Sequence, residues 1–344
     1  MEPVDWAALE RLRSLFLQPG ATRAPYWRSR TDLASYDATA GQRIGWKWDA
    51  VLEELASRNW TPPQGTVLDY GCGSGIAGRR VLGAFGAESR ACLWLHDRSP
   101  LAMEFARERA AERFPGMEIR CAGAGDLEAA SQIGLLLVSH VLGELPGKEQ
   151  RRLVALARRA TAVIWVEPGT HADSHALVRI REELREEFHL VAPCTHRSPC
   201  GLLAPGNEAH WCHHFARPPW EIFSDPDWAE YARRMGIDLR SLPYSYLVLD
   251  RRDPVAVEEG WSRVLGAPRA YKGYSRVFSC DACGVRDLRI SRRPFPEFVD
   301  ALSETSGPRR VRWRTEGTDV VAIEAPVFSG REDLGLEAAP DSIA

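Results

Sequence analysis

The apolar positions of the chain fall into two periods, and together these predict an alternation of strands and helices. Within residues 48–60, Trp48, Val51, Leu52 and Leu55 have the i, i+3, i+4, i+7 spacing of one helix face. Further on, short and largely apolar runs have the length of buried strands; they lie at 67–68, 91–96, 134–140 and 162–166. Helical stretches follow some of these runs, at 100–114 and 148–159. Such an alternation with short turns indicates a parallel sheet covered by helices.

The first of these strands runs into a glycine-rich turn. The segment TVLDYGCGSG places Asp69 two residues before Gly71, and Gly73 and Gly75 follow at alternate positions. Glycines let the backbone turn sharply and approach a ligand, with the N–H groups of the next helix pointing at it. The position of the acid is typical of S-adenosylmethionine sites rather than of G-x-G-x-x-G dinucleotide loops. A plain tight turn is the alternative.

Polar side chains also follow the other predicted strands. Because ligands bind at the carboxyl ends of parallel strands, we expect one cofactor cleft lined by Asp69, Asp97, His140 and Glu167. Asp97 is placed to accept hydrogen bonds from the ribose hydroxyls of an adenosyl cofactor. Asp126, in a later loop, is either an adenine contact or a helix cap. The predicted fold class is therefore α/β, with a class I methyltransferase-like (Rossmann-like) sheet.

The rest of the chain adds to this sheet at three places. We predict a helical N-terminal region at 1–60, a methyltransferase-like domain at 61–253 and a small β-rich C-terminal region at 254–344. Strand-like pieces at 189–192 and 244–251 are expected to form an antiparallel hairpin at the end of the sheet. The segment 191–217 would then be a cysteine-rich insertion in the hairpin connection.

This insertion contains three of the eight cysteines, Cys194, Cys200 and Cys212, and four of the nine histidines. Prolines and glycines interrupt it, so it buries little apolar surface of its own. Thiolates that close on a metal centre would hold it folded, because metal-binding energy is also folding energy there. A surface loop with free thiols is the alternative. The remaining cysteines in or beside predicted strands are expected to be ordinary buried residues: Cys72, Cys92 and Cys121.

Composition limits the partners. The formal net charge of −3 excludes a generally basic nucleic-acid binder, so any RNA contact must come from a local patch. One candidate is 308–314, PRRVRWR, where Arg309, Arg310, Arg312 and Arg314 surround Trp313; a solvated strand face is the alternative. Since no apolar run approaches the roughly 18 residues of a membrane span and the N-terminus carries early acids, we expect a cytoplasmic protein with reduced thiols.

The motifs VLDYGCGSG, SHVLGEL, WVEPGT, VAPCTHRSPC, HWCHHF and YSYLVLDR occur in that order between residues 36 and 293. Through these motifs the chain resembles the mitochondrial ribosomal small-subunit methyltransferase-like proteins and their bacterial relatives. The resemblance implies an S-adenosylmethionine-type fold, a [4Fe–4S] cluster on four cysteines, and a role in small-subunit ribosome assembly. It makes Cys194, Cys200 and Cys212 ligands, with Cys280 as the fourth, because Gly284 follows it at the family's spacing. Cys283 is the competitor.

The chain departs from the family in PCTH, CGL and CHHF and in a longer gap between the second and third cysteines. A zinc site therefore stays an alternative. Three thiolates would bind the zinc together with a fourth ligand, which would be another thiolate, His196 or His213. The five-residue gap between Cys194 and Cys200 is unlike the short knuckle of most zinc sites and favours iron–sulfur.

Two classes of function fit these observations. In the first, the protein transfers a methyl group from S-adenosylmethionine to small-subunit ribosomal RNA or a ribosomal protein, with His140 or Glu144 as the base if the acceptor loses a proton. No N-P-P-[YF] motif for exocyclic amines is present. In the second, the cofactor fold and cluster shape an RNA-binding assembly factor without turnover. Methylation of a small molecule, with a structural zinc site, is a third alternative.

Overall fold

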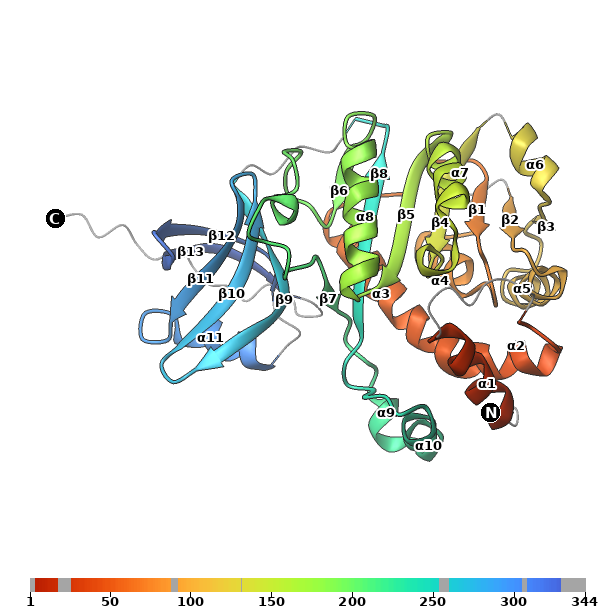
Figure 1. The fold of residues 1–344 in the computed structure, drawn as a ribbon, viewed down its shortest axis with the longest axis horizontal. Coiled ribbons are helices and arrows are strands. Elements are labelled where there is room, and N and C mark those ends of the chain that lie inside the picture. Colours follow the sequence, from red (N-terminus) through yellow and green to blue (C-terminus); the bar gives the residue numbers. More distant parts are fainter. Residues whose placement is uncertain are drawn as a thin grey trace.

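A helix-covered sheet and a β-barrel stand next to each other in the structure (Figure 1). The computed structural model describes residues 4–17, 26–87, 92–130, 132–253, 260–304 and 308–328. Among the helices of these residues, none combines the length and the apolarity that a membrane crossing requires.

Five parallel strands form most of the sheet: β1 (Val67–Tyr70), β2 (Leu93–His96), β3 (Ile119–Cys121), β4 (Ile133–Ser139) and β5 (Ala160–Pro168). Next to β5 come β8 (Pro243–Asp250), which is antiparallel to it, and then β6 (His189–Ala192). The order along the sheet is β3-β2-β1-β4-β5-β8-β6, and the short β7 (His214–Phe215) also pairs with β8. This is the strand order and direction of the class I methyltransferase fold, as the sequence predicted.

Helices cover both faces of the sheet, because almost every central strand residue is apolar and buried. One apolar core joins the sheet to helices of one layer: α3 (Gln42–Ser57), α4 (Ile76–Phe85) and α5 (Pro100–Arg113). A second core lies against α6 (Ala124–Ala129), α7 (Gly147–Ala157) and α8 (His171–Leu184). Several starts follow the sequence signals: α4 begins at Ile76 directly after the glycine turn, and Ser99 caps α5 by accepting from the Ala102 N–H at 3.3 Å.

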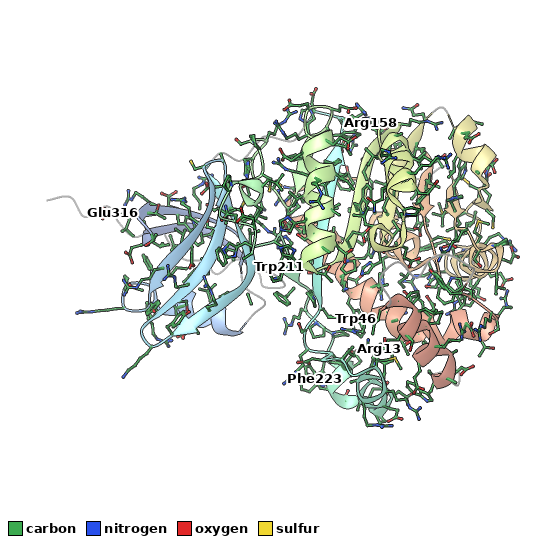
Figure 2. The ribbon with its side chains drawn as sticks, viewed as in Figure 1. Arg13, Trp46, Arg158, Trp211, Phe223 and Glu316 are labelled. Carbon is green, nitrogen blue, oxygen red and sulfur yellow. The ribbon has the colours of Figure 1, made fainter. Side chains whose placement is uncertain are left out.

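The described residues ahead of the sheet are mostly helical, and the division of the chain at residue 60 stays a prediction. The helical elements are α1 (Trp6–Phe16), α2 (Arg30–Tyr36), a π-helical turn (Asp37–Gly41) and α3. Two further helices, α9 (Glu221–Ser224) and α10 (Pro226–Met235), form an arm between β7 and β8 that extends below the sheet (Figure 1). The Trp46 ring packs on Trp228 at 4.9 Å between centroids, so α3 holds this arm (Figure 2).

The C-terminal β-rich part is a closed barrel with the order β10-β11-β13-β12-β9. Its strands are β9 (Trp261–Tyr271), β10 (Tyr274–Asp281), β11 (Gly284–Ser291), β12 (Pro308–Glu316) and β13 (Asp319–Phe328), and α11 (Pro296–Glu304) precedes β12. The barrel has its own apolar core, which includes Val277, Leu288 and Trp313.

Two sequence predictions are corrected at this level. Trp313 was expected to contact a nucleic-acid base from β12, but its side chain is buried in the barrel core, and Arg310 on the same strand is buried as well. Cys121 was expected to be buried, but it is exposed, because it ends the edge strand β3; Cys72 and Cys92 are buried as predicted. The side chain of Arg309 lies outside the described residues.

Candidate cofactor cleft and cysteine pocket

The glycine turn after β1 adopts a backbone that only glycine accommodates easily. Gly71, Gly73 and Gly75 all have positive φ, at 70°, 51° and 80°. A Cβ on Gly71 would lie 2.4 Å from Val141, and one on Gly75 would lie 2.8 Å from the Ala106 Cβ. At Gly73 a Cβ would meet nothing within 4 Å. The first and third glycines therefore allow close packing against neighbouring side chains, whereas the second borders open space.

Two aspartates hold this turn in place. The Asp97 carboxylate accepts hydrogen bonds from the Gly73 N–H at 3.0 Å and the Ser99 N–H at 2.9 Å. Asp69 is fully buried; one oxygen accepts from the Gly78 N–H at 2.9 Å, and the other has no hydrogen-bond partner. Burial raises the pKa of Asp69 to about 7 and also raises the pKa of Asp97.

A cleft of about 400 Å³ opens at this edge of the sheet, which is within the usual range for a small-molecule site. Of the residues predicted from sequence, six line it: Gly71, Gly73, Asp97, His140, Glu144 and Glu167. Asp69 and Gly75 lie behind the turn and do not line the cleft. The N-terminal region also lines the cleft with aromatic side chains, which include Phe16 at the end of α1, Tyr26 between α1 and α2, and Tyr36 at the end of α2.

Asp126 takes the capping role that the sequence left open. It lies in the first turn of α6, accepts from the Gly123 N–H at 2.8 Å and pairs with Arg120 at 3.2 Å. It does not line the cleft. Its contact with an adenine stays a prediction.

His140 directly follows β4 and has a positive φ of 56°, which is uncommon for a residue with a side chain. Its Nε2 lies 3.2 Å from the Lys47 Nζ, and its Nδ1 lies 3.4 Å from the Ser139 hydroxyl. The pKa of Lys47 is lowered to about 7, mainly by burial and then by the nearby charge of Arg43. The pKa of His140 is also lowered, mainly by burial and then by the charge of Lys47. A neutral imidazole next to a lysine that titrates near neutral pH can accept a proton.

Two carboxylic acids complete this part of the cleft. Glu144 lies 3.2 Å from the Arg98 guanidinium and 3.4 Å from the Tyr26 hydroxyl, and burial raises its pKa. Glu167 is fully buried; one oxygen accepts from the Trp165 indole N–H at 2.8 Å and from two backbone N–H groups after β4. Burial raises the pKa of Glu167 to about 8. Glu167 therefore orders the loop that carries His140.

The second candidate site lies on the other side of β8. The cysteine-rich segment leaves the sheet at β6 and returns through β7, so it is inserted in the antiparallel hairpin connection as predicted. A cavity of about 30 Å³ between this segment, α8 and β9 is lined by all four proposed ligands: Cys194, Cys200, Cys212 and Cys280. Three come from the insertion, and Cys280 is supplied by barrel strand β10.

The thiols interact electrostatically. Burial, and then the proximity of Cys194, raises the pKa of Cys200 to about 11, and Cys212 and Cys280 shift upward from the same two causes. Cations nearby are Arg181 and Arg263. Within the described residues no three Cys, His, Asp or Glu side chains have the arrangement of a metal-ligand group. The fold thus gathers the four thiols without the geometry of a closed metal site.

Of the three competing ligands, His196 lines the pocket, and Cys283 and His213 do not. Cys283 is exposed in the turn after β10 and does not line the pocket. His196 does line it, with its Nε2 3.7 Å from the Cys280 sulfur. The His213 ring instead stacks on Trp211 at 4.5 Å, and Trp211 lies between sheet and barrel (Figure 2). Of the two histidines proposed as zinc ligands, only His196 reaches the pocket.

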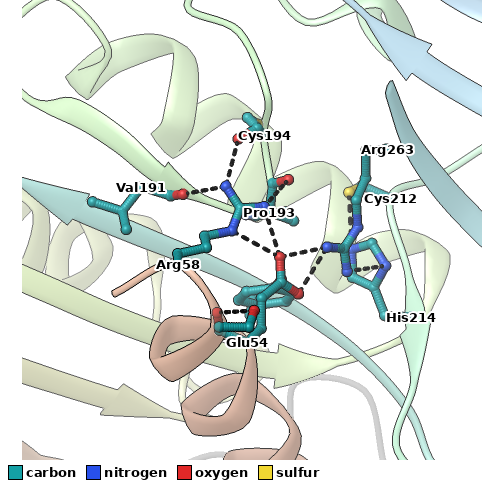
Figure 3. A network of polar contacts seen from close by, with 10 residues as sticks. Glu54, Arg58, Val191, Pro193, Cys194, Cys212, His214 and Arg263 are labelled. Atoms are coloured by element: carbon teal, nitrogen blue, oxygen red, sulfur yellow. Dashed lines mark hydrogen bonds and ion pairs between the residues drawn. The ribbon is translucent and has the colours of Figure 1, made fainter. Parts of the chain in front are cut away.

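A buried polar network joins the pocket to α3 (Figure 3). Glu54 accepts from Arg263 at 2.6 and 2.7 Å, from Arg58 at 2.6 Å and from the Tyr246 hydroxyl at 2.5 Å. Arg58 also donates to the Val191 and Pro193 carbonyls at 2.7 and 3.2 Å and to the Cys194 carbonyl at 3.4 Å. A single buried carboxylate therefore positions the start of the cysteine-rich segment.

The same network reaches the third cysteine. Arg263 contacts the His214 Nδ1 at 3.2 Å, and the His214 Nε2 lies 3.7 Å from the Cys212 sulfur. Sequence reasoning missed Glu54 and Lys47. The signal was present, because both lie on the apolar face of α3, where charged residues at helical spacing need buried partners.

A sequence profile described as "Mitochondrial small ribosomal subunit Rsm22" matches residues 38–293. This match spans well over half of the chain, and the protein therefore belongs to the Rsm22 family. No curated protein matches the chain significantly.

Among solved structures, the chain is similar to the plantazolicin methyltransferase BamL in complex with S-adenosylhomocysteine, at 10% identity and a TM-score of 0.40, covering 71% of this chain and 98% of that one. It is also similar to magnesium protoporphyrin IX methyltransferase from Synechocystis, at 11% identity and a TM-score of 0.38, covering 72% and 94%. An S-adenosylmethionine-dependent methyltransferase from Leishmania major gives 13% identity, a TM-score of 0.35 and coverage of 71% and 83%. Such distant likenesses carry no argument about activity.

Proposed function

We propose that this chain is an S-adenosylmethionine-binding, methyltransferase-like protein with a [4Fe–4S] cluster, which acts on or binds small-subunit ribosomal RNA in ribosome assembly. The observation that carries the proposal is the cleft at the glycine turn, where Gly73 borders open space and Asp97 lies at the end of the second strand. Asp97 and the turn would hold the cofactor, since helix α4 starts directly after the turn and the positive end of its dipole lies there.

S-adenosylmethionine supplies an activated methyl group when bound. The residues of the chain would orient the acceptor, exclude water and, where the acceptor loses a proton, receive it. His140 is one candidate base, since its lowered pKa keeps the ring neutral and the ring lines the cleft; Glu144 is the other, and burial makes its carboxylate more basic because it raises the pKa. The aromatic side chains of the N-terminal helices would shield this chemistry from solvent.

One observation favours the second candidate function, a binding factor without turnover. Both ring nitrogens of His140 already have partners within the chain, Lys47 and Ser139. A histidine held on both sides can simply fix the strained loop after β4. In this alternative the cleft binds its cofactor as a structural element, and RNA binding elsewhere is the activity.

The four thiols support the cluster part of the proposal. Iron–sulfur clusters are held by thiolates, and Cys194, Cys200, Cys212 and Cys280 line one small cavity that contains Arg181 and Arg263 as cationic neighbours. Two guanidinium groups would offset part of the charge of four thiolates and a cluster. Zinc on the same thiolates, or with His196 in place of one, is the alternative.

Membership of a family described as a mitochondrial small ribosomal subunit component supports the ribosome as the partner. Small-subunit RNA is the expected ligand, and the cytoplasmic location stays a prediction. We also propose the division into a helical region at 1–60, the methyltransferase-like domain at 61–253 and the barrel region at 254–344.

Calorimetric titration with S-adenosylmethionine tests the proposal. The wild-type protein should bind it, and Asp97→Asn should weaken binding about tenfold or more through loss of a charged acceptor. Asp126→Asn is the matched control, since Asp126 caps α6 outside the cleft; an equal loss in this variant would instead place Asp126 at the adenine. No binding at millimolar cofactor would refute the cofactor part of the proposal.

A further inference from the structure

The barrel has a specific topology. Counted from β9, its strands follow the closed order one-two-three-five-four, with a helix, α11, between the third and fourth. The third and fifth strands, β11 and β13, meet in parallel at Arg289 and Asp319, whereas the other pairs are antiparallel. This is the topology of the OB-fold, whose second and third strands and first hairpin loop commonly bind oligonucleotides.

The corresponding surface can be read from the register. On β10, Ser275, Val277 and Ser279 are buried in the barrel, so the alternate residues face outward. Opposite Arg276 stand Arg269 on β9 and Arg289 on β11. Three arginines therefore form one row across three strands on the outer face of the barrel.

Next to this row lies a pair of tyrosines at the β9–β10 turn. Tyr271 and Tyr274 are paired in register, and their rings stack at 4.8 Å with an angle of 9° between planes. Tyr271 is 49% exposed. The Arg289 guanidinium lies 4.9 Å from the Tyr274 ring. The turn points away from the sheet (Figure 1). One face of the Tyr271 ring is stacked on Tyr274, so its opposite face is the one left for a base.

Neighbouring carboxylates offset only part of the charge of the arginine row. Asp287 pairs with both Arg269 at 2.5 Å and Arg276 at 3.2 Å, and Asp319 pairs with Arg289 at 3.0 Å. Lys272 adds a further exposed cation at the tip of the turn. The patch therefore contains four basic groups and two carboxylates on a protein whose formal net charge is −3. A polyanion would find its local positive field here.

The other end of the same face leads to the cysteine pocket. Cys280 lies on β10 in the outward set with Tyr274, Arg276 and Phe278, and the Phe278 ring is covered by His210 of the insertion at 4.3 Å. The open surface thus runs from the tyrosines to the arginine row and stops where the cysteine-rich segment packs on the barrel. Its length suits a few nucleotides, as single OB-folds do.

We propose that the outer face of β9, β10 and β11, with Tyr271 and Tyr274 as stacking platform and the row Arg269, Arg276 and Arg289 as phosphate contacts, binds single-stranded RNA. Single strands are favoured because the exposed Tyr271 ring, supported by Tyr274, can receive an unpaired base, whereas duplex bases are already stacked. The choice of RNA rests on the proposed function. This surface replaces β12, whose Trp313 is buried, as the RNA-contacting part of the barrel.

Fluorescence anisotropy with the full-length, anaerobically purified protein tests this. The probes are a labelled 12-nucleotide single-stranded RNA of mixed sequence and the corresponding RNA duplex. The single strand should bind about tenfold tighter or better, and Tyr271→Ala with Tyr274→Ala should weaken its binding about tenfold or more. Arg276→Ala should lower the slope of log affinity against log salt by roughly 0.7.

Matched controls lie on the helical arm. Trp220→Ala removes an aromatic side chain that is 75% exposed on α9, and Arg233→Ala removes an exposed, ion-paired arginine on α10. Both should leave affinity and salt slope unchanged. Unchanged binding by the tyrosine and Arg276 variants, a preference for duplex, or no binding by wild type would overturn the inference. Cofactor titration and iron analysis of the same preparations separate its failure from that of the proposed function.

Discussion

Glu54 and Arg263 form a buried ion pair. It joins helix α3, which precedes the sheet in the sequence, to strand β9 of the barrel. The carboxylate oxygens lie 2.6 and 2.7 Å from Arg263 Nη1, and the two side chains are 0% and 3% exposed. Residues more than 200 positions apart in sequence are thereby fixed beside the cysteine pocket. Such a pair is costly to bury, but once buried it is costly to break, because the remaining charge has lost its partner.

Glu54→Gln should therefore destabilise the protein by about 3–5 kcal/mol, measured as the free energy of unfolding in denaturant. Arg58, Arg263 and the Tyr246 hydroxyl would lose their common anionic acceptor. Glu230→Gln is the control, because Glu230 makes ion pairs with Arg233 and Arg234 on the exposed surface of α10, where a change of at most about 1 kcal/mol is expected. Equal effects of the two substitutions would contradict the role given to Glu54.

The glycine turn gives a second prediction, on cofactor binding. Gly73→Ala places a methyl group on the side that borders the cleft, so the affinity for S-adenosylmethionine should fall about tenfold or more. The backbone itself would be strained by about 1–2 kcal/mol, because φ is 51°.

Gly116→Ala is the matched control for that strain. Gly116 also has a positive φ, 87°, and open space around a Cβ, but it lies after α5, outside the cleft. Both variants should lose similar stability, and only Gly73→Ala should lose cofactor affinity in a calorimetric titration. Cofactor binding by Gly73→Ala at wild-type strength would show that the ligand does not approach this turn.

A third prediction concerns pH. Burial lowers the pKa of Lys47 to about 7 from its usual 10.5. Between pH 7 and pH 10.5 the unfolded chain therefore binds more protons at this site than the folded chain does. Stability therefore rises with pH across this window. Lys47→Met should remove this contribution, so that wild type gains about 2 kcal/mol more than the variant between pH 7 and pH 9. Lys148→Met, at an exposed position on α7, should follow the wild-type curve.

Local sequence signals were sufficient to predict much of the sheet. The apolar strands, the glycine turn that starts α4 at Ile76, and the Ser99 cap are short-range features, and each was predictable because its cause lies within a few residues. The hairpin around the cysteine-rich segment followed from two apolar runs. Asp97, His140 and Glu167 meet in one cleft because parallel strands share an edge, whereas Asp69 lies behind the glycine turn.

What the sequence did not reveal depends on packing between distant segments. Trp313 and its arginine neighbours alternate like a nucleic-acid-binding strand, and only barrel closure decides that the indole faces inward. Glu54 becomes buried, and the half-buried Lys47 meets His140, only when α3 docks on the rest of the protein. The sequence separated Cys280 from its competitor Cys283 only through the family's spacing to Gly284, whereas the β10 register places the first at the pocket and the second in the turn.

The central claim, that four distant cysteines bind one iron–sulfur cluster, is tested most directly by metal analysis of three proteins purified without oxygen. Wild type and Cys283→Ser should each contain about four iron and four sulfide ions per chain, and Cys280→Ser should retain clearly less of both. Zinc without iron or sulfide in wild type would replace the cluster by a zinc site on the same ligands. Wild-type protein without bound metal, or a Cys280→Ser variant that keeps the full complement, would contradict the account.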